Sequence, residues 1–274
     1  MCRHSGNARL RAAGTAALVL AVVLVWPVSA AAQELRVMIS GAFSAPYLEV
    51  MPEFERTTKF MVITVSGASM GGAPDSIPVR LERGEPADVL ILASTALDDL
   101  IRQGKAVPGS RVDLVKSSIG MAVRAGARKP DISTVDALKR TLVDAKSIAY
   151  SASASGVYVS TELFPRLGVA DQVRGKSRRI ESERVGVVVA RGDAEIGFQQ
   201  ISELLPIAGI DYVGPLPAEV QRVTVFSAGI AASSKQREAA RGLIAFLASP
   251  AVTAAVVKSG LEPVATSAGL KSQR

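Results

Sequence analysis

Short apolar segments alternate with amphipathic helical stretches over most of the chain, and this alternation constrains the fold more than any other feature. The first such series predicts strands over 35–39, 60–65 and 87–92 and helices over 45–57, 77–83 and 97–103. The segment 87–92 is almost wholly apolar, as expected for a strand that is buried on both faces. Strands and helices in this order predict an α/β fold with a mostly parallel sheet and helices on both of its faces.

The alternation returns in the middle of the chain and predicts a second α/β unit. Its elements are expected as strands over 119–123, 147–150, 194–198 and 211–213 and helices over 134–143, 156–167 and 185–191, and a strand over 222–231 and helices over 235–247 and 251–258 follow them. Two such units predict two lobes: residues 33–116 with 228–264 in lobe 1, and residues 117–227 in lobe 2. Residues 265–274 are small and polar, and we expect a disordered tail. Ligands of open α/β sheets bind at the carboxyl ends of strands, so we expect the ligand in a cleft between the lobes.

The first 32 residues have the features of a secretory signal peptide. Arg3, Arg9 and Arg11 precede an apolar run over 16–25, and Ala30-Ala31-Ala32 fits the A-x-A cleavage pattern. The apolar run is shorter than the roughly 20 residues that a membrane-spanning helix needs. We therefore expect residues 1–32 to be a signal peptide, residues 33–274 to be the mature chain, and the mature protein to be periplasmic.

The chain has one cysteine, one histidine and one tryptophan, and all three lie in this leader, at Cys2, His4 and Trp26. The mature chain therefore has no disulfide, no Ser-His-Asp triad and no zinc site made of cysteine or histidine. Haem with a histidine or cysteine axial ligand is excluded on the same ground. Two kinds of function remain: catalysis by Asp, Glu or Lys, and binding without catalysis. No cofactor or metal is expected.

The charge of the chain is modestly basic. The full sequence has 32 basic and 25 acidic residues, a formal net charge of +7, and loss of the three leader arginines leaves 29 basic residues against 25 acidic ones. The signs are well mixed along the chain, and export also argues against a nucleic-acid partner. We expect a partner of small size instead.

Three turns at predicted strand ends are uncharged and rich in Ser, Gly and Ala. They follow the strands at 35–39, 60–65 and 147–150, and they cover residues 40–44, 66–72 and 151–156. Small residues let the backbone approach a ligand closely, and hydroxyls and free N–H groups at a helix start can bind an anion without a formal positive charge. Serine and glycine are also ordinary turn and N-cap residues. Their repetition at three strand ends favours an anion site.

Three stretches carry a resemblance to a known family. Residues 80–93 run from a helix through glycine and Pro-Ala-Asp into a strand, residues 155–158 form a small-Gly-apolar-Tyr helix start, and residues 187–198 join a helix, an arginine, an acidic turn and a glycine-containing strand. In this order and spacing the chain resembles the periplasmic molybdate-binding proteins of ABC transporters, from about residue 35 to 263. The resemblance implies a two-lobed periplasmic binding protein that closes by a hinge, acts as a monomer, delivers its ligand to a membrane permease and is not an enzyme.

In that family, uncharged donors from both lobes hold a small oxyanion such as molybdate or tungstate. Carried over position by position, the resemblance implies ligand contacts at Ala42, Phe43, Ser69, Ser155, Ser182 and Gln200, and we expect Ser40, Ser44 and Met70 beside them to contribute as well. Two positions depart from the family. Ala42 stands where the family has a serine, with Ser40 and Ser44 near enough to substitute, and Gln200 stands where it has a tyrosine.

These departures leave a second ligand class open, a small organic carboxylate. A guanidinium binds a carboxylate through two parallel hydrogen bonds, and Arg184, beside Ser182 at a predicted helix start, is the residue that we expect to do so. A third and more remote interpretation is a secreted hydrolase or lyase that uses Asp, Glu or Lys. The mature chain has no histidine that could complete a Ser-His-Asp triad in support of it.

Overall fold

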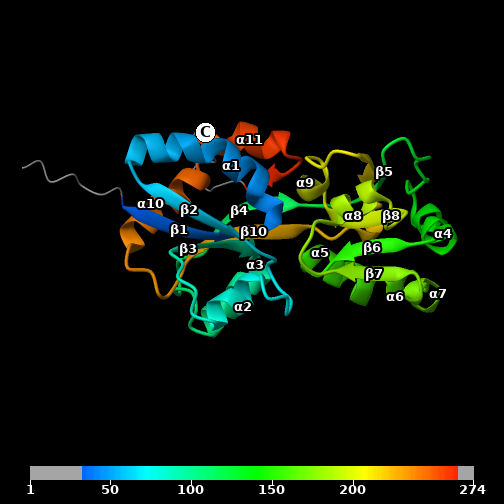
Figure 1. Cartoon of the computed structure of the whole chain (residues 1–274), viewed down its shortest axis with the longest axis horizontal. Coiled ribbons are helices and arrows are strands. Elements are labelled where there is room, and N and C mark those ends of the chain that lie inside the picture. Colours follow the sequence, from blue (N-terminus) through cyan, green and yellow to red (C-terminus); the bar gives the residue numbers. More distant parts are fainter. Residues whose placement is uncertain (1–32, 265–274) are drawn as a thin grey trace, which may run out of the picture. The chain divides into compact units, whose positions relative to one another are not determined.

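A computed structural model describes residues 33–264, which form two lobes, each built on its own sheet (Figure 1). The predicted signal peptide and the predicted C-terminal tail lie outside the described residues. The two-lobed α/β prediction is confirmed. The structure differs from this prediction in one respect: both sheets are mixed rather than mostly parallel.

The sheet of lobe 1 has six strands in the order β11-β4-β10-β3-β1-β2. Their bounds are β1 Glu34–Ile39, β2 Met61–Ser66, β3 Val89–Ala93, β4 Val112–Ser117, β10 Thr224–Ile230 and β11 Glu262–Pro263. Strand β1 pairs in parallel with β2 and β3, as the alternation predicts. Strand β10 returns from the other lobe and runs antiparallel to both β3 and β4, which makes the sheet mixed.

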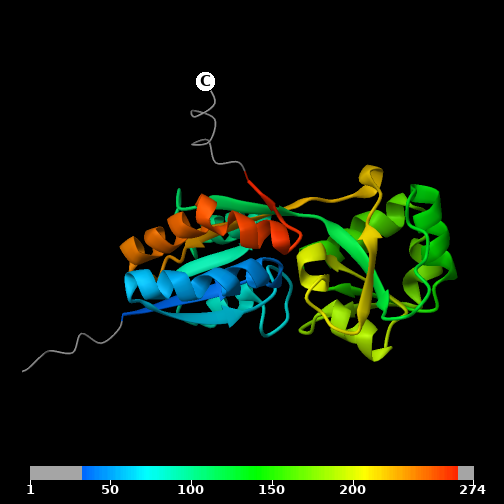
Figure 2. The ribbon, with the colours of Figure 1, turned by 90° about the horizontal axis from the view of Figure 1, so that it is seen from above.

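Helices cover both faces of this sheet (Figures 1 and 2). On one face α1 packs against α10 and α11, and on the other α3 packs against β3 and β10. The bounds are α1 Gly41–Thr58, α2 Ile77–Glu82, α3 Ser94–Arg102, α10 Arg237–Leu247 and α11 Thr253–Lys258, with a 3-10 turn at Pro250–Val252. Among these described helices none is long and apolar enough to cross a membrane alone, and only the bent pair of α10 and Pro250–Lys258 has that composition when taken together.

The sheet of lobe 2 has five strands in the order β7-β6-β8-β5-β9. Their bounds are β5 Ile119–Arg124, β6 Ile148–Ser151, β7 Ser177–Ile180, β8 Ile196–Gln200 and β9 Ile210–Pro215. The helices are α4 Val135–Asp144, α5 Ala154–Tyr158, α6 Phe164–Arg166, α7 Ala170–Arg174, α8 Val185–Arg191 and α9 Ile201–Leu204, with a π-helical turn at Val159–Leu163 and a 3-10 turn at Ala218–Val220. Strand β6 is parallel to its neighbours, whereas β5 is antiparallel to both of its own.

Each lobe has a separate aliphatic core. All five residues of β3 are buried, and this strand forms the centre of the core of lobe 1. The core of lobe 2 gathers side chains from β5, β6 and β8 around Phe198. Two cores of this kind let each lobe hold its own shape, so that a ligand site can form between them.

The chain crosses between the sheets twice. Only Ser118 separates β4 from β5, and the return runs from the end of β9 to the start of β10 at Thr224. The side-chain amide of Gln221 ties the two crossings together, because it accepts from the Ile119 N–H and donates to the Ile119 carbonyl, both at 2.9 Å.

Helix α1 begins earlier than the sequence pattern predicts. The expected turn over 40–44 forms the N-cap and first turn of α1, which starts at Gly41 rather than at residue 45. Phe43 and Tyr47 are completely buried on the same face of this helix, and their packing extends it toward β1. The change matters for the site, because it decides which side chains of this segment face the cleft.

Candidate functional site

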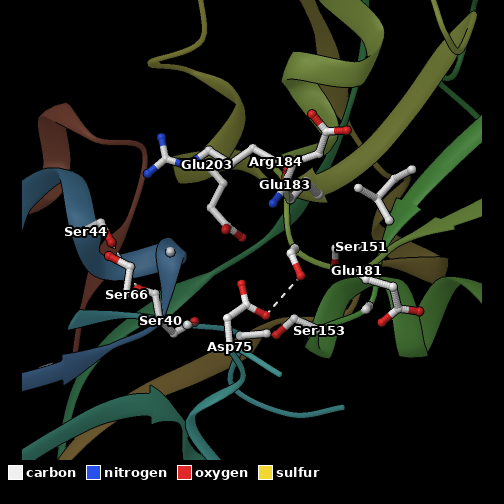
Figure 3. Close-up of a pocket in the computed structure, with 17 residues that line it drawn as sticks. Ser40, Ser44, Ser66, Asp75, Ser151, Ser153, Glu181, Glu183, Arg184 and Glu203 are labelled. Carbon is white, nitrogen blue, oxygen red and sulfur yellow. Dashed lines mark hydrogen bonds between the residues drawn. The ribbon is translucent and has the colours of Figure 1, made fainter. Parts of the chain in front are cut away.

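A cavity of about 140 Å³ lies between the two lobes, at the carboxyl ends of β1, β2, β6 and β7 (Figure 3). This volume is below the usual range for pockets that hold drug-sized ligands, and it suits a small metabolite or ion. Its walls carry many hydroxyl and carboxyl groups. The lining residues are Ser40, Gly41, Ser44, Ser66, Gly67, Ala68, Asp75, Ser151, Ala152, Ser153, Ile180, Glu181, Ser182, Glu183, Arg184, Gln199 and Glu203.

The start of α1 forms one wall. Ser40 is the N-cap residue and its side chain makes no capping bond, while Ser44 lies one turn further on and donates to the Ser40 carbonyl at 3.3 Å. Residues four apart on a helix share a face, so both serines line the cavity. Ala42 and Phe43 point the other way, into the core of lobe 1, and do not line it.

The turn after β2 forms the next part of this wall, through Ser66, Gly67 and Ala68. Ser69 is completely buried behind it, where its hydroxyl accepts from the Ala93 N–H at 3.0 Å and its own N–H donates to Ser153 at 3.2 Å. Met70 packs against the core of lobe 1. Of the positions predicted on this turn, Ser69 therefore supports the wall from behind, and Met70 does not line the cavity either.

Lobe 2 contributes the turn after β6. Ser151 and Ser153 line the cavity, and Ser155, which the sequence pattern indicated, lies behind them. The Ser155 hydroxyl is buried and shares a hydrogen bond of 3.0 Å with the hydroxyl of Ser151. Ser155 thus orients a lining serine without lining the cavity itself.

The loop after β7 brings Ser182 and Arg184 to the cavity, as the sequence pattern predicted. The Ser182 hydroxyl donates to the Asp75 carboxylate of lobe 1 at 3.0 Å, so this contact spans the two lobes. Glu183 is engaged elsewhere, because both of its oxygens accept from Arg191 at 2.9 Å, and these bonds hold its pKa below the usual range. Glu181 pairs with Arg179 at 3.1 Å.

Arg184 is half-buried and precedes α8 as its N-cap residue. Among the described residues no carboxylate lies within 4.0 Å of its guanidinium, although its charge still acts on the nearby Glu203. A cation that lines a cavity and is not neutralised by an ion pair is available to a negatively charged ligand.

Glu203, on α9, is the main residue that the sequence pattern did not indicate. It is partly buried, and its carboxylate points into the cavity (Figure 3). Loss of solvent around it raises its pKa to about 7, while the charge of Arg184 and a hydrogen bond from Gln199 act in the opposite direction. A carboxyl with this pKa exchanges a proton readily near neutral pH, which is the property of a general base.

The two glutamines at the end of β8 have different roles. Gln199 lines the cavity, and its side-chain oxygen accepts from the Val185 N–H at 2.9 Å, which fixes the start of α8. Gln200 is buried, donates to Thr224 at 3.1 Å and does not line the cavity. Within residues 33–264 its side-chain oxygen has no hydrogen-bond partner.

One simple rule would have found Glu203. Glu203 lies on the helical turn that follows the predicted strand at 194–198, so the rule that ligands bind after strand ends applies to it as it does to the three serine-rich turns. The site as built combines a proton-exchanging carboxyl, an available guanidinium and a ring of hydroxyls. Within residues 33–264 no group of three or more Asp, Glu, His or Cys is placed to hold a metal. This set can bind a carboxylate or another anion and move a proton on it.

Comparison with known proteins gives one family and several relatives. Residues 35–262 match the profile of the bacterial extracellular solute-binding proteins. An aconitate isomerase from Pseudomonas sp. is 48% identical over 230 residues, which cover 84% of this chain and 88% of the relative. The molybdate-binding protein ModA of Azotobacter vinelandii is 26% identical over 243 residues, covering 85% and 91%. A solved structure of the periplasmic molybdate-binding protein of Azotobacter vinelandii superposes with a TM-score of 0.65 at 22% identity, covering 85% of this chain and 99% of that one.

These findings confirm the resemblance to the molybdate-binding proteins and correct one expectation. From the resemblance we expected a protein that is not an enzyme. A relative that is 48% identical over most of both chains carries the name of an enzyme, so that expectation is wrong. It came from the binding proteins that the chain resembles, and it did not take the Glu203 carboxyl into account.

Proposed function

Because this chain belongs to the family of bacterial extracellular solute-binding proteins, we propose that it binds a small organic polycarboxylate between its lobes and isomerises it, with aconitate as the substrate. The observation that carries the proposal is that Glu203 and Arg184 line the same cavity. The first supplies a carboxyl whose pKa is about 7, and the second supplies a guanidinium that no carboxylate neutralises among the described residues. The relative named aconitate isomerase supports the choice of substrate.

The chemistry needs one base and no cofactor. Aconitate carries a carboxylate on each carbon of a three-carbon chain that contains one double bond. The Glu203 carboxylate removes a proton from the methylene carbon, and the electron pair spreads over the three carbons and their carboxylates. The Glu203 carboxyl exchanges its proton with solvent and then protonates the opposite end carbon, and the double bond moves by one position. The substrate and the product have the same constitution, so the geometry of the new double bond depends on the conformation in which the ligand is held.

The guanidinium of Arg184 has two tasks in this scheme. It binds one carboxylate through parallel hydrogen bonds, and it stabilises the negative charge that spreads along the ligand after the proton is removed. The hydroxyls of Ser40, Ser44, Ser66, Ser151 and Ser153 line the cavity and supply neutral donors for the remaining carboxylates. Positioning by both lobes keeps the two end carbons within reach of a single carboxyl.

A second candidate function is binding for transport without chemistry. Membership in the solute-binding family favours it, and it would explain the cavity between two lobes. A carboxylate ligand fits this candidate better than molybdate does. Ala42 and Gln200, where the expected oxyanion contacts depart from the molybdate-binding pattern, both lie outside the cavity, whereas Arg184, which can bind a carboxylate through two hydrogen bonds, lines it.

The location and partners of the protein are part of the proposal. The predicted signal peptide supports a periplasmic location of the mature chain. A permease of an ABC importer is the expected partner if the transport function is retained. We propose that the protein acts as a monomer, because both walls of the cavity come from one chain.

The first experiment incubates the mature protein with each geometric isomer of aconitate and follows both isomers by proton NMR. We expect the two reactions to reach the same final ratio. In heavy water, deuterium should enter the methylene position as the isomers interconvert, because the scheme moves that hydrogen. If the protein binds aconitate tightly but does not interconvert its isomers, the isomerisation proposal is wrong and the transport function is favoured.

Replacement of Glu203 by glutamine tests the base directly. Glu203→Gln keeps the shape of the side chain but cannot take up a proton, so we expect kcat to fall by about 10³-fold, within the usual range for a general base. Binding of aconitate, followed by dye-based thermal shift, should persist. A dye is needed because residues 33–274 contain no tryptophan. Molybdate and tungstate belong in the same panel, and a shift with these oxyanions but not with aconitate would contradict the proposed substrate class.

A further inference from the structure

Gly41, the first residue of α1, lies directly against the Glu203 carboxyl. A Cβ atom built on Gly41 would be 2.2 Å from one carboxyl oxygen of Glu203 and 3.1 Å from its carboxyl carbon. Real Cβ atoms do not approach another atom to 2.2 Å. The carboxyl therefore occupies the space that any other residue at position 41 would fill with its own side chain.

This contact joins the two lobes. Helix α1 belongs to lobe 1, and Glu203 lies on α9 of lobe 2. The neighbouring residues repeat the contact, because the buried Ser202 hydroxyl donates to the Ala42 carbonyl at 2.7 Å. Two consecutive residues of α9 thus meet two consecutive residues of α1, and the hydrogen bond fixes the register between the two helices.

We propose that Gly41 is a positioning residue for the isomerisation proposed above: its missing side chain lets α9 place the Glu203 carboxyl against the first turn of α1, at the reach that the proton transfer needs. The inference rests on the proposed function for its catalytic meaning. The contact itself is a feature of the fold that can be tested separately.

The geometry makes the test selective. The atoms that a new side chain would meet are at the far end of a flexible glutamate, not backbone. Gly41→Ala therefore displaces the carboxyl and leaves the fold intact. We expect kcat to fall by about 10²-fold, which is the usual cost of misplacing a catalytic group by about 1 Å. The KM for aconitate should change by less than about threefold on this reasoning, because Arg184 and the serines remain in place.

Gly242→Ala is the matched control. Gly242 lies within α10, and among the described residues no atom beyond its chain neighbours and the nearby backbone of the same helix lies within 4 Å of the position of its Cβ. The chemical change is the same, in a helix, without a contact to disturb, so kcat should remain within about twofold of the unchanged protein on the expectation for exposed sites. An equal loss of kcat in both variants would overturn the proposal.

Replacement of Glu203 by aspartate provides a test that distinguishes a positioning role of Gly41 from a merely structural one. Glu203→Asp withdraws the carboxyl by one methylene group and lowers kcat by itself, but it also removes the atoms that a Cβ at position 41 would meet. In this background Gly41→Ala should cost less than about threefold in kcat instead of about 10²-fold, so the two effects should be strongly non-additive. Fully multiplicative effects would show that the two residues act independently and would contradict the proposal.

Failure of the proposed function can be told apart from failure of this inference. Titration of the glutamate carboxyls by carbon-13 NMR reads Glu203 without any substrate. Gly41→Ala should move its midpoint from about 7 toward the ordinary glutamate range, because the displaced carboxyl regains solvent. If the protein without substitutions does not isomerise aconitate, the proposed function is wrong. If Gly41→Ala leaves the titration midpoint of Glu203 where it was, the proposed role of Gly41 is wrong.

Discussion

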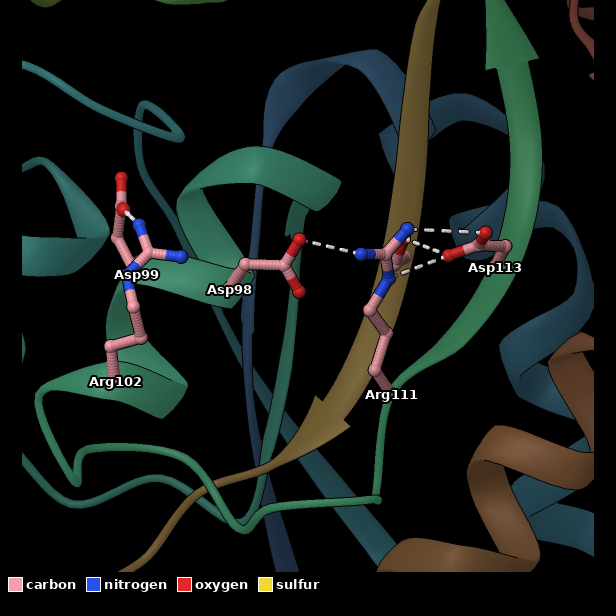
Figure 4. Close-up of polar contacts among 6 residues, drawn as sticks. Asp98, Asp99, Arg102, Arg111 and Asp113 are labelled. Carbon is pink, nitrogen blue, oxygen red and sulfur yellow. Dashed lines mark hydrogen bonds and ion pairs between the residues drawn. The ribbon is translucent and has the colours of Figure 1, made fainter.

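Two half-buried arginines of this chain differ in what surrounds them. Arg111 lies between two carboxylates (Figure 4): it donates to Asp98 of α3 at 2.6 Å and to the two oxygens of Asp113 of β4 at 2.8 and 3.2 Å. The Asp113 carboxylate also accepts from the buried Ser227 hydroxyl of β10 at 2.6 Å. Arg184 lines the cavity, and the described part of the chain places no carboxylate within ion-pair distance of it.

The difference separates a charge that holds the fold from a charge that is available to a ligand. The Arg111 group joins a helix and two strands of lobe 1, and every charge in it has a partner. In the cavity, Arg184 has none and Glu203 holds its proton up to about pH 7. If this comparison is right, variants of the first group should change stability and leave activity alone, whereas variants of the second should change activity and affect stability only through the titration of Glu203.

Arg184→Ala should produce the largest effect. It removes the cation that binds a ligand carboxylate, so we expect the affinity for aconitate to fall by about 10²- to 10³-fold, or about 3–4 kcal/mol. The free energy of unfolding without ligand should stay nearly unchanged, since no ion pair is lost. Isothermal titration with aconitate and urea denaturation measure the two quantities. A large loss of stability with unchanged affinity would reverse the comparison.

The second-largest effect should be on the pH dependence of the free energy of unfolding, to which we expect Glu203 to contribute. Its pKa in the folded protein, about 7, lies above the value of about 4.3 in an unfolded chain, so the folded state binds this proton more tightly. The stabilisation is fully present below about pH 4 and is lost as the pH rises through 7. Between pH 5 and pH 8 the unchanged protein should therefore lose up to about 3 kcal/mol that Glu203→Gln does not lose.

Urea denaturation of both proteins at the two pH values checks this prediction. Glu219→Gln is the matched control, because Glu219 is an exposed glutamate of the 3-10 turn at Ala218–Val220. A curve for Glu203→Gln that is parallel to that of the unchanged protein would show that Glu203 is not the titrating group.

Asp113→Ala should lower stability by an intermediate amount. It leaves the buried Ser227 hydroxyl without its acceptor and Arg111 with Asp98 alone, and an unsatisfied buried hydroxyl costs about 1–3 kcal/mol. Isomerase activity should remain within about twofold, as for substitutions remote from the site. Burial raises the pKa of Asp113, but the bonds from Arg111 and Ser227 outweigh it and the net pKa is lowered, so this stabilisation is lost only in acid. Equal stabilities of the two proteins in urea at pH 7 would contradict the structural role.

Asp98→Ala should have the smallest effect. Asp98 is more exposed than Arg111, and a pair of this kind contributes about 0.2–1 kcal/mol. Added salt should reduce the difference from the unchanged protein further. Denaturation at low and high ionic strength measures it, and a cost above that of Asp113→Ala would mean that α3 depends on this pair more than the structure indicates.

The fold could be predicted from the sequence because its main signals are local. The apolar run at 87–92 became β3, with a shift of only two residues at its start. Helix α1 was predicted too short, because Gly41 favours a turn locally, whereas the burial of Phe43 and Tyr47 against the sheet extends the helix to it. The mixed character of the sheets depends on where β10 returns, and no local pattern contains that information.

The site was predicted in part for the same reason. Ser40, Ser44, Ser182 and Arg184 lie at strand or helix ends, and the structure brings all four to the cavity. Glu203 was not indicated, because its raised pKa depends on burial against α1, far away in the sequence. Ala42 and Phe43 were indicated from the family pattern, but the first turn of α1 directs both side chains to the core.

The contact between Gly41 and Glu203 also bears on how sequences of this family are sorted. A family profile recognises the scaffold, and the scaffold is the same whether a protein delivers its ligand or transforms it. The two residues at issue are far apart in the chain, and neither belongs to a recognisable motif. A glycine at the start of the first helix together with a glutamate three residues beyond the β8 strand is therefore a pair that can be searched for directly. If the pair has the role proposed above, its presence would separate isomerases from receptors among chains that otherwise share one label.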